Sequence, residues 1–337
     1  MTIRVGINGL GRIGRCVIRA LYENQTPQQV RGSIELVAVN GPAPVETHVH
    51  LLKYDSVHGR FATEVKTDGE HLSIGGKTVK LFHERDPKNI PWGSMDVDVV
   101  LECTGKFNKR AEAAQHLESG AKKVLISAPA EDADATIVFG VNNAMLKKDH
   151  QVISVGSCTT NGLAPLVKAL HEAIGIESGF MTTIHAYTGD QNLVDNSHKD
   201  LRRARAAGLS MIPTSTGAAK TIGLILPELK GKLDGVSIRV PTPNVSMIDL
   251  SFIAKSDTTK EQINMALRQA SQHTLRGVLG ISEEPLVSID YTHSNLSSIA
   301  DLTGTYVTGG KLCRVASWYD NEWAFSCRML DVVKLWA

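Results

Sequence analysis

Apolar and polar positions alternate differently in the two halves of the chain. In the first half, short apolar runs at 3–7, 34–39, 97–101, 123–126 and 151–155 are separated by longer polar or helix-like stretches such as 15–22. Strands buried on both faces and connected by helices have this pattern. A further strand is expected at 136–140. The first half therefore predicts an α/β domain with a doubly wound parallel sheet.

The second half combines β-branched runs with fewer, longer helical stretches. We expect strands at 179–184, 235–240, 247–254, 286–289 and 311–318, and helices at 163–173, 260–274 and 325–335. Residues 190–213 are polar and irregular, which predicts a long loop. Strands gathered in one region and covered by helices are typical of an α+β domain with a mostly antiparallel sheet.

Composition narrows the class of protein. The chain has 337 residues, 42% hydrophobic and 21% charged, and its net charge is +1; these values suggest roughly two soluble domains. They predict neither nucleic-acid nor membrane binding, because the chain has no basic excess and no apolar run long enough for a membrane helix. The five cysteines lack disulfide or zinc spacing. With no signal-peptide pattern before residue 3, these features predict a cytoplasmic enzyme.

The apolar run at 3–7 leads directly into a glycine turn, residues 8–14, and then a helix. In this context Gly9 would permit the tight turn, Gly11 the approach of a pyrophosphate, and Gly14 the packing of helix on strand. The alternative is a glycine-rich turn without a ligand. The arrangement predicts a Rossmann dinucleotide site.

Small polar residues follow the other predicted strands of the first half. Thr104 and Ser127 would line the cofactor cleft, or would belong to ordinary turns. After the second strand, where an acid would bind the adenosine ribose, the chain has Asn40 and Gly41. It therefore lacks a built-in repulsion of a 2′-phosphate, unless Glu46 takes the place of that acid.

Cys158 lies in a turn of small polar residues at the predicted start of a helix. Unpaired N–H groups and the helix dipole favour a thiolate there, so Cys158 is a candidate nucleophile. The alternative is a cysteine packed as a small hydrophobic residue. His185, at the end of the predicted strand 179–184, is a candidate base, although an isolated histidine is more often structural.

Three stretches of the second half suggest anion binding. The basic run 199–205 would by charge alone be a solvated segment, but it precedes the hydroxyl-rich turn 214–220, which can surround an anion. Arg239 ends another predicted strand. Asn321, in the turn before the closing helix, is available to hold an amide.

These motifs together resemble the phosphorylating glyceraldehyde-3-phosphate dehydrogenase family along essentially the whole chain. The matching stretches are 8–14, 157–161, 185–191, 200–205, 213–220, 239–244 and 318–323. The resemblance implies an NAD(P)-binding Rossmann domain at 1–156, a catalytic domain at 157–321, and a closing helix at 322–337 that packs back on the first domain. It also implies a homotetramer in which the loop near 187–213 helps to form a neighbour's cofactor site.

The resemblance assigns a role to each matching residue. Cys158 would attack the aldehyde of glyceraldehyde 3-phosphate, His185 would take its proton, and inorganic phosphate would cleave the resulting thioester. Arg12 and Ile13 would lie on the pyrophosphate of the cofactor, and Asn321 on its carboxamide. The substrate-phosphate site would consist of Thr188, Asp190 and Arg239, and the inorganic-phosphate site of Ser157, Thr159, Arg203, Thr216 and Gly217.

The chain departs from the usual family pattern at three places, two of which concern NAD-linked members. Gly41 replaces the usual acid, and Asn196-Ser197 replaces the usual Leu-Pro; a serine there resembles the NADP-using photosynthetic and gluconeogenic members. Ser197 could donate a hydrogen bond to a 2′-phosphate. We therefore predict that the enzyme uses NAD or NADP as its cofactor. A stronger version of this hypothesis is that it prefers NADP. Gly162, where a second cysteine is common, has no expected catalytic cost.

Two other functions remain open. Erythrose-4-phosphate dehydrogenase shares the cysteine turn but forms a free acid, and residues 214–219 match the phosphorylating type instead. The other possibility is a dinucleotide-binding scaffold without catalysis, which the presence of both Cys158 and His185 disfavours.

Overall fold

The computed structural model describes residues 2–23 and 34–337, and the chain forms two compact units. The first unit consists of Met1–Ile137, Asn143–Gly156 and Ser326–Ala337, and the second of Val138–Asn142 and Ser157–Phe325. The main passage from one unit to the other is thus between Gly156 and Ser157, immediately before the candidate nucleophile.

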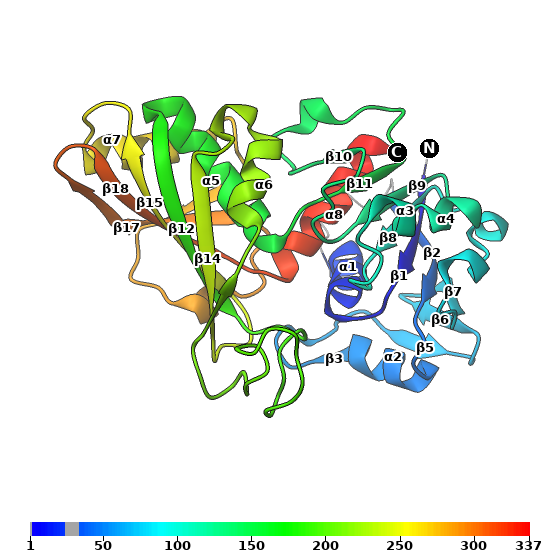
Figure 1. The fold of residues 1–337 in the computed structure, drawn as a ribbon. Helices are drawn as coiled ribbons and strands as arrows, with labels where there is room; N and C mark the ends of the chain where they lie inside the picture. Colours follow the sequence, from blue (N-terminus) through cyan, green and yellow to red (C-terminus); the bar gives the residue numbers. More distant parts are fainter. Residues whose placement is uncertain (1, 24–33) are drawn as a thin grey trace. The chain divides into compact units, whose positions relative to one another are not determined.

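The first unit is built on one mixed sheet (Figure 1). Among the described residues its nine strands run in the order β10-β11-β9-β8-β1-β2-β7-β6-β5, parallel from β10 to β7 and antiparallel from β7 to β5. The strands are β1 Ile3–Asn8, β2 Ile34–Asn40, β5 Val65–Thr67, β6 His71–Ile74, β7 Lys77–Phe82, β8 Val99–Glu102, β9 Lys123–Ile126, β10 Ala135–Thr136 and β11 Val152–Ser154. The predicted α/β class is confirmed.

Helices and short turns connect these strands. They are α1 Arg12–Glu23, α2 Val45–Lys53, η1 Pro87–Asn89, η2 Trp92–Met95, α3 Arg110–Ala113, α4 Gln115–Glu118 and η3 Asn143–Met145, with a small hairpin of β3 Tyr54–Asp55 and β4 Gly59–Arg60. Every residue of β8 is buried, as expected for a strand covered on both faces. The last helix, α8 Trp323–Trp336, ends in this unit, where Lys123 Nζ donates to the carbonyl oxygen of Trp336 at 2.6 Å.

The second unit has a seven-stranded sheet within the described residues, in the order β13-β14-β12-β15-β18-β17-β16. Most of its neighbours are antiparallel, as predicted; only the pairs β12–β14 and β16–β17 are parallel. The strands are β12 Ile176–Ala186, β13 Ile212–Ser215, β14 Leu233–Val240, β15 Ser246–Ala254, β16 Leu279–Ser282, β17 Ser298–Thr308 and β18 Leu312–Tyr319.

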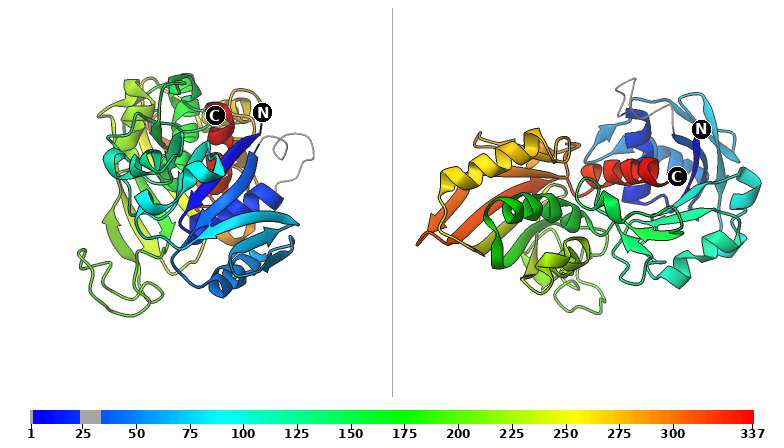
Figure 2. Two further views of the ribbon diagram at one scale, coloured as in Figure 1. Left: turned by 90° about the vertical axis from the view of Figure 1, so that its right-hand side faces the viewer. Right: turned by 90° about the horizontal axis from the view of Figure 1, so that it is seen from above.

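Helices cover one face of this sheet (Figure 2). They are α5 Cys158–Ile174, α6 Ala218–Ile225 and α7 Lys260–Gln272. The unit also contains the short turns η4 Pro227–Leu229 and η5 Ser288–Tyr291. Leu163, Leu166 and Leu170 of α5 are fully buried in the core between helices and sheet. Their helical spacing is the pattern that predicted α5 from the sequence.

Two predicted strands are wrong in position or length. Residues 286–289 form no strand, because Val287 and Ile289 are exposed and the chain turns there as η5; the strand is β16, earlier in the sequence. The strand expected at 136–140 ends at Thr136, since Asn142 closes a turn by accepting a hydrogen bond from the backbone N–H of Val138. No helix among residues 2–23 and 34–337 has the length and apolar character needed to span a membrane.

Candidate active site

Cys158 is the first residue of α5. Ser157 caps this helix: its Oγ accepts a hydrogen bond from the backbone N–H of Thr160 at 3.0 Å. An N-cap serine satisfies one of the N–H groups that have no partner within a helix, and the others remain directed toward the helix start. The thiol therefore lies at the positive end of a 17-residue helix.

His185 lies next to the last residue of β12, and its Nε2 is 3.5 Å from Cys158 Sγ. The other ring nitrogen, Nδ1, is 2.6 Å from the carbonyl oxygen of Ala186. The tautomer with its proton on Nδ1 donates to this carbonyl and presents the Nε2 lone pair to the thiol. This tautomer suits a general base.

Arg239, the residue beside His185 in the neighbouring strand β14, completes this cluster. Its Nη1 donates to the Ala186 carbonyl at 3.1 Å and lies 2.9 Å from His185 Nδ1. Burial, together with the Arg239 charge, lowers the pKa of His185 to about 3. The imidazole is therefore neutral over the whole physiological pH range.

The Cys158 thiol is subject to opposing influences. Burial raises its pKa, whereas the Arg239 charge and hydrogen bonds from Thr159 and from its own backbone N–H lower it. Burial outweighs the helix terminus in this geometry, so the free thiolate that the sequence suggested is disfavoured. A proton acceptor at Nε2 gains importance for this reason.

Tyr319 contacts His185 and Thr159, the residue after Cys158. Its hydroxyl is 2.8 Å from the hydroxyls of Thr159 and Thr183, and its ring meets the His185 ring edge to face, with centroids 6.0 Å apart. A Cβ added at Gly162 would lie 3.0 Å from the Tyr319 ring. The glycine therefore makes room for Tyr319, a packing role that the sequence did not reveal.

Two side chains predicted for different anion sites meet in the long loop. Arg203 Nη1 is 2.5 Å from Asp190 Oδ2, and Arg203 Nε donates to Thr214 Oγ1 at 2.9 Å. Burial opposes ionisation of Asp190, but the hydrogen bond and charge of Arg203 outweigh it and lower the pKa of that carboxyl. The charges of Arg203 and Asp190 also act on Arg239.

The other predicted anion ligands already have local partners. Ser157 caps α5, Thr159 bonds to Tyr319, Thr188 Oγ1 receives the N–H of Asp190 at 3.4 Å, and Thr216 Oγ1 receives that of Ala218 at 3.2 Å, next to the N-cap of α6 at Gly217.

Asn321 and Ser197, the predicted cofactor residues of the second unit, lie in different surroundings. Asn321 is buried, and its Oδ1 accepts from Ser246 Oγ, which in turn receives the backbone N–H of Ala186. Ser197 is exposed in the loop and donates its N–H to Asn196 Oδ1.

In the first unit, the glycine turn has the geometry that a dinucleotide requires. Gly9 has φ of +101°, and a Cβ there would lie 2.8 Å from the Thr104 nitrogen. A Cβ at Gly14 would lie 2.0 Å from the Gly9 oxygen, so α1 packs closely on the turn, whereas Gly11 faces open space. The residues therefore fit a pyrophosphate at the start of α1.

A pocket of about 250 Å³ opens beside this turn. Of the predicted residues, Gly9, Gly11, Asn40 and Thr104 line it. Three of the remaining lining residues, Asn8, Pro42 and Cys103, stand in turns that the sequence placed at this site. The other four, Glu84, Arg85, Lys106 and Phe107, carried no such signal. Glu84 and Arg85 follow β7, and only the position of β7 next to β2 in the sheet brings them here.

Arg12, Ile13 and Ser127, also predicted for the cofactor site of this unit, do not line the pocket. Arg12 forms a two-point ion pair with Asp55, at 2.5 and 3.1 Å. Backbone hydrogen bonds and Arg12 lower the pKa of Asp55 to about 2, against the effect of burial. Ile13 follows Arg12 at the start of α1, and the Ser127 N–H donates to the Glu102 carbonyl.

Gly41 is covered by a histidine. A Cβ at this position would lie 2.7 Å from both Cε1 and Nε2 of His48, a buried residue of α2. Glu46, the acid considered as a substitute, is exposed on the first turn of α2 and does not line the pocket.

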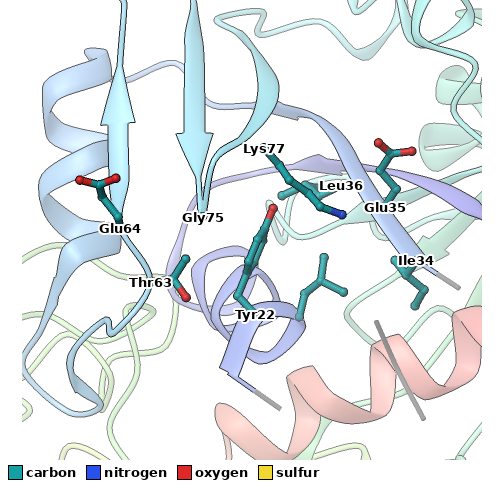
Figure 3. Close-up of a pocket in the computed structure, with 9 residues that line it drawn as sticks. Tyr22, Ile34, Glu35, Leu36, Thr63, Glu64, Gly75 and Lys77 are labelled. Atoms are coloured by element: carbon teal, nitrogen blue, oxygen red, sulfur yellow. The ribbon is translucent and has the colours of Figure 1, made fainter. Parts of the chain in front are cut away.

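A separate pocket of about 400 Å³ lies between the end of α1, strand β2, the residues before β5 and the start of β7. It is lined by Leu21, Tyr22, Ile34, Glu35, Leu36, Thr63, Glu64, Gly75 and Lys77 (Figure 3). None of the predicted site residues contributes to it.

Each of the two units matches a domain model of one known protein family. Residues 3–110 match the glyceraldehyde 3-phosphate dehydrogenase NAD binding domain, and residues 157–321 match the C-terminal domain of the same enzyme. The chain belongs to the glyceraldehyde-3-phosphate dehydrogenase family. Each matched segment lies within one compact unit, the first with the glycine turn and the second with Cys158 and His185.

Relatives of this family cover nearly the whole chain. Proteins named glyceraldehyde-3-phosphate dehydrogenase from Xanthobacter flavus, Cereibacter sphaeroides and Geobacillus stearothermophilus are 57%, 56% and 54% identical to it, each over 98% of this chain and 97% of the relative. The chain is thus a dehydrogenase with a nicotinamide-dinucleotide-binding domain, as the sequence predicted.

Proposed function

We propose that the chain catalyses the reversible oxidation of D-glyceraldehyde 3-phosphate, with inorganic phosphate, to 1,3-bisphosphoglycerate. The observation that carries this proposal is the 3.5 Å approach of Cys158 Sγ to His185 Nε2, with Nδ1 at 2.6 Å from a carbonyl oxygen. This arrangement pairs a nucleophile with a correctly oriented base. Relatives with this enzyme's name support the choice of substrate.

In the first step Cys158 Sγ bonds to the aldehyde carbon. The thiol proton passes to His185 Nε2 and from there to the aldehyde oxygen, which gives a thiohemiacetal. The backbone N–H of Cys158, at the start of α5, and the His185 ring stabilise negative charge on that oxygen as it develops.

The second step converts the thiohemiacetal to a thioester. The bound dinucleotide supplies the hydride acceptor for this oxidation. His185 accepts the hydroxyl proton as the carbon–hydrogen bond breaks. An oxygen of inorganic phosphate then attacks the thioester carbon, the carbon–sulfur bond breaks, and the sulfur leaves as the Cys158 thiolate beside the protonated His185.

Two groups of side chains would hold the phosphates. Thr188, Asp190 and Arg239 form the proposed substrate-phosphate site, and the inorganic phosphate would bind near Ser157, Thr159, Arg203, Thr216 and Gly217. The Arg203–Asp190 ion pair joins the two groups. A phosphate competing for Arg203 would break this pair, and Thr214 would keep the guanidinium in place.

Other residues would hold the dinucleotide. The pyrophosphate would lie on the glycine turn with Arg12 and Ile13, Thr104 and Ser127 would line the cleft, and Asn321 would hold the carboxamide. Asp55 keeps Arg12 oriented through two hydrogen bonds.

We also propose that the enzyme accepts NADP as a cofactor. The stronger version of this hypothesis is that it prefers NADP over NAD. Gly41 brings no carboxylate to the ribose end, and the pocket contains the cations Arg85 and Lys106, although Glu84 also lines it. Ser197 could add a hydrogen bond, supplied by a neighbouring subunit. The test is kcat/KM for NAD and NADP with the same aldehyde; a strong preference for NAD would overturn this part of the proposal.

A homotetramer working in the cytoplasm completes the proposal. Large apolar side chains are exposed on the loop between β12 and β13, namely Leu193, Val194, Leu201, Leu209 and Met211. An apolar group of this size usually marks an interface. The five cysteines, all of which lie among the described residues, form no disulfide with one another, which suits a reducing compartment.

Replacement of the nucleophile tests the mechanism. In Cys158→Ser we expect dehydrogenase activity to fall below detection, because a serine hydroxyl beside a neutral histidine is a far weaker nucleophile. The dissociation constants of NAD and NADP should stay within about twofold, since the glycine turn is untouched. Retention of turnover in this variant would contradict the mechanism.

A further inference from the structure

Three neighbouring strands of the first unit end in polar residues at the same level of the sheet. Asn8 of β1 is paired in register with Asn40 of β2 on one side and with Glu102 of β8 on the other. The carboxyl ends of parallel strands are where α/β sheets bind ligands. Asn8 and Asn40 line the proposed dinucleotide pocket, whereas Glu102 is buried beneath it, with 1% of its surface exposed.

Every contact of the Glu102 carboxylate is with a hydrogen-bond donor. Oε1 accepts from the backbone N–H of Thr104 at 2.7 Å and from the Thr104 hydroxyl. Oε2 accepts from Asn8 Nδ2 at 2.6 Å and lies 3.0 Å from His116 Nε2. A buried carboxylate needs such donors to offset its lost hydration. All four groups donate, so both carboxylate oxygens serve as acceptors.

The buried indole of Trp92 fixes the protonation of His116. Trp92 Nε1 lies 2.9 Å from His116 Nδ1, and an indole N–H can only donate. Nδ1 is therefore the acceptor, and the ring proton is on Nε2, directed at Glu102. Both side chains are fully buried. The Trp92 ring itself has room because β1 has a glycine, Gly6, beneath it.

The network ends on the pocket wall. Thr104 carries both donors to Oε1, and its backbone nitrogen packs against Gly9 of the glycine turn. On the other side, Asn40 Nδ2 donates to Asn8 Oδ1 at 2.8 Å, and Asn40 Oδ1 accepts the Glu84 N–H. Hydrogen bonds that begin at Glu102 thus reach three separate segments of the wall, at Thr104, Asn40 and Glu84.

We propose that Glu102 is a positioning residue for the dinucleotide: the Trp92–His116–Glu102 chain holds Thr104, Asn8 and Asn40 in the binding arrangement. Glu102 itself touches no cofactor. The proposal rests on the assignment of this pocket to the dinucleotide, and not on which aldehyde is oxidised.

The decisive variant is Glu102→Gln, which keeps the shape of the side chain. Its amide N–H₂ would face either the N–H of Thr104 or the N–H groups of Asn8 and His116. His116 cannot change tautomer to accept, because Trp92 occupies Nδ1. In either orientation, one hydrogen-bond donor therefore faces another. The residues that line the dinucleotide pocket must shift to relieve this. We expect the dissociation constants of NAD and NADP each to rise by about tenfold or more, measured by calorimetry on the full chain.

Stability has to be separated from positioning. Ile74→Val or Ile74→Ala, in β6 of the same unit, provides a control of matched melting temperature, because Ile74 is fully buried and does not line the pocket. The control should bind dinucleotide like the wild type. His116→Leu, a second variant without polar atoms, should weaken binding severalfold.

Two further measurements distinguish a positioning role of Glu102 from a general loss of stability. In Glu102→Gln the KM for dinucleotide should rise far more than kcat falls, and alkylation of Cys158 without dinucleotide should keep its wild-type rate. Unchanged affinity in both variants, or a loss that the Ile74 control reproduces at equal melting temperature, would overturn the proposal. Because calorimetry needs no turnover, failure to oxidise glyceraldehyde 3-phosphate would refute only the proposed function.

Discussion

At the scale of single residues, the reactivity of Cys158 depends on a charge that does not bond to it. Burial raises the pKa of the thiol, and Arg239 is the largest influence that lowers it. Because the pKa is raised, the thiolate population should increase as the pH rises through and above the ordinary range of thiols. His185, with a pKa of about 3, stays neutral meanwhile.

Arg239→Met should therefore slow alkylation of Cys158 by iodoacetamide at pH 7 severalfold and move the midpoint of the rate profile to higher pH. Arg314→Met is the matched control, because Arg314 pairs with Asp249 and lies outside this cluster. Its profile should match the wild type. A midpoint displaced to lower pH in Arg239→Met would show that the guanidinium does not favour the thiolate.

Gly41 and His48 offer a second residue-scale prediction. Gly41→Asp alone should lower the melting temperature, since its Cβ would lie 2.7 Å from the His48 ring. Gly41→Asp combined with His48→Ala should recover stability and shift the ratio of kcat/KM toward NAD, because an acid there repels a 2′-phosphate. Strictly additive effects of the two substitutions on melting temperature would argue against this coupling.

The site residues that the sequence predicted belong to short motifs that carry their own signal. Cys158 follows a strand and begins a helix, and Gly9 to Gly14 form a recognisable turn. Glu84 lacks such a signal, and Glu102 is found only as part of the turn that contains Thr104. Their place depends on which strands are neighbours and in which register, which is decided by packing of the whole sheet.

At the scale of elements, the start of α5 serves both folding and chemistry. Ser157 caps the helix, so Ser157→Ala should reduce the free energy of unfolding by about 1 kcal/mol. It should also raise the KM for inorganic phosphate severalfold, because Ser157 belongs to the proposed phosphate site. Denaturant unfolding and initial rates measure the two effects.

The chain contains a natural control for this substitution. Thr259 caps α7 in the same way, by accepting the N–H of Gln262. Thr259→Ala should cost a similar free energy and leave the KM for phosphate unchanged. An equal change in KM in both variants would mean that Ser157 acts only as a cap.

Elements with a strong hydrophobic period could be predicted, and marginal ones could not. The core of α5 and the strands β1, β2 and β9 follow from the sequence pattern. The strand expected at 286–289 was wrong because Val287 and Ile289 are exposed. The short hairpin strands β5 and β6 were not predicted because polar residues alternate through them. The hydrophobic pattern of a short segment cannot distinguish an exposed apolar residue from one in the core.

At the scale of the whole molecule, the loop between β12 and β13 should be an interface. Leu201 and Leu209 are 82% and 85% exposed. The double variant Leu201→Glu, Leu209→Glu should convert a tetramer to smaller species in sedimentation velocity. Met145→Glu, at an apolar residue of the first unit that is 40% exposed, should leave the tetramer intact. A monomeric wild type would refute the proposed assembly.

The central claim is that Cys158 carries an acyl group which only phosphate removes. The most direct measurement is rapid-mixing absorbance of reduced dinucleotide, with glyceraldehyde 3-phosphate and no phosphate, followed by mass spectrometry of the chain. We predict a burst of one reduced dinucleotide per chain, an acyl adduct on Cys158, and continuous turnover once phosphate is added. Steady turnover without phosphate, or no adduct on Cys158, would contradict this account.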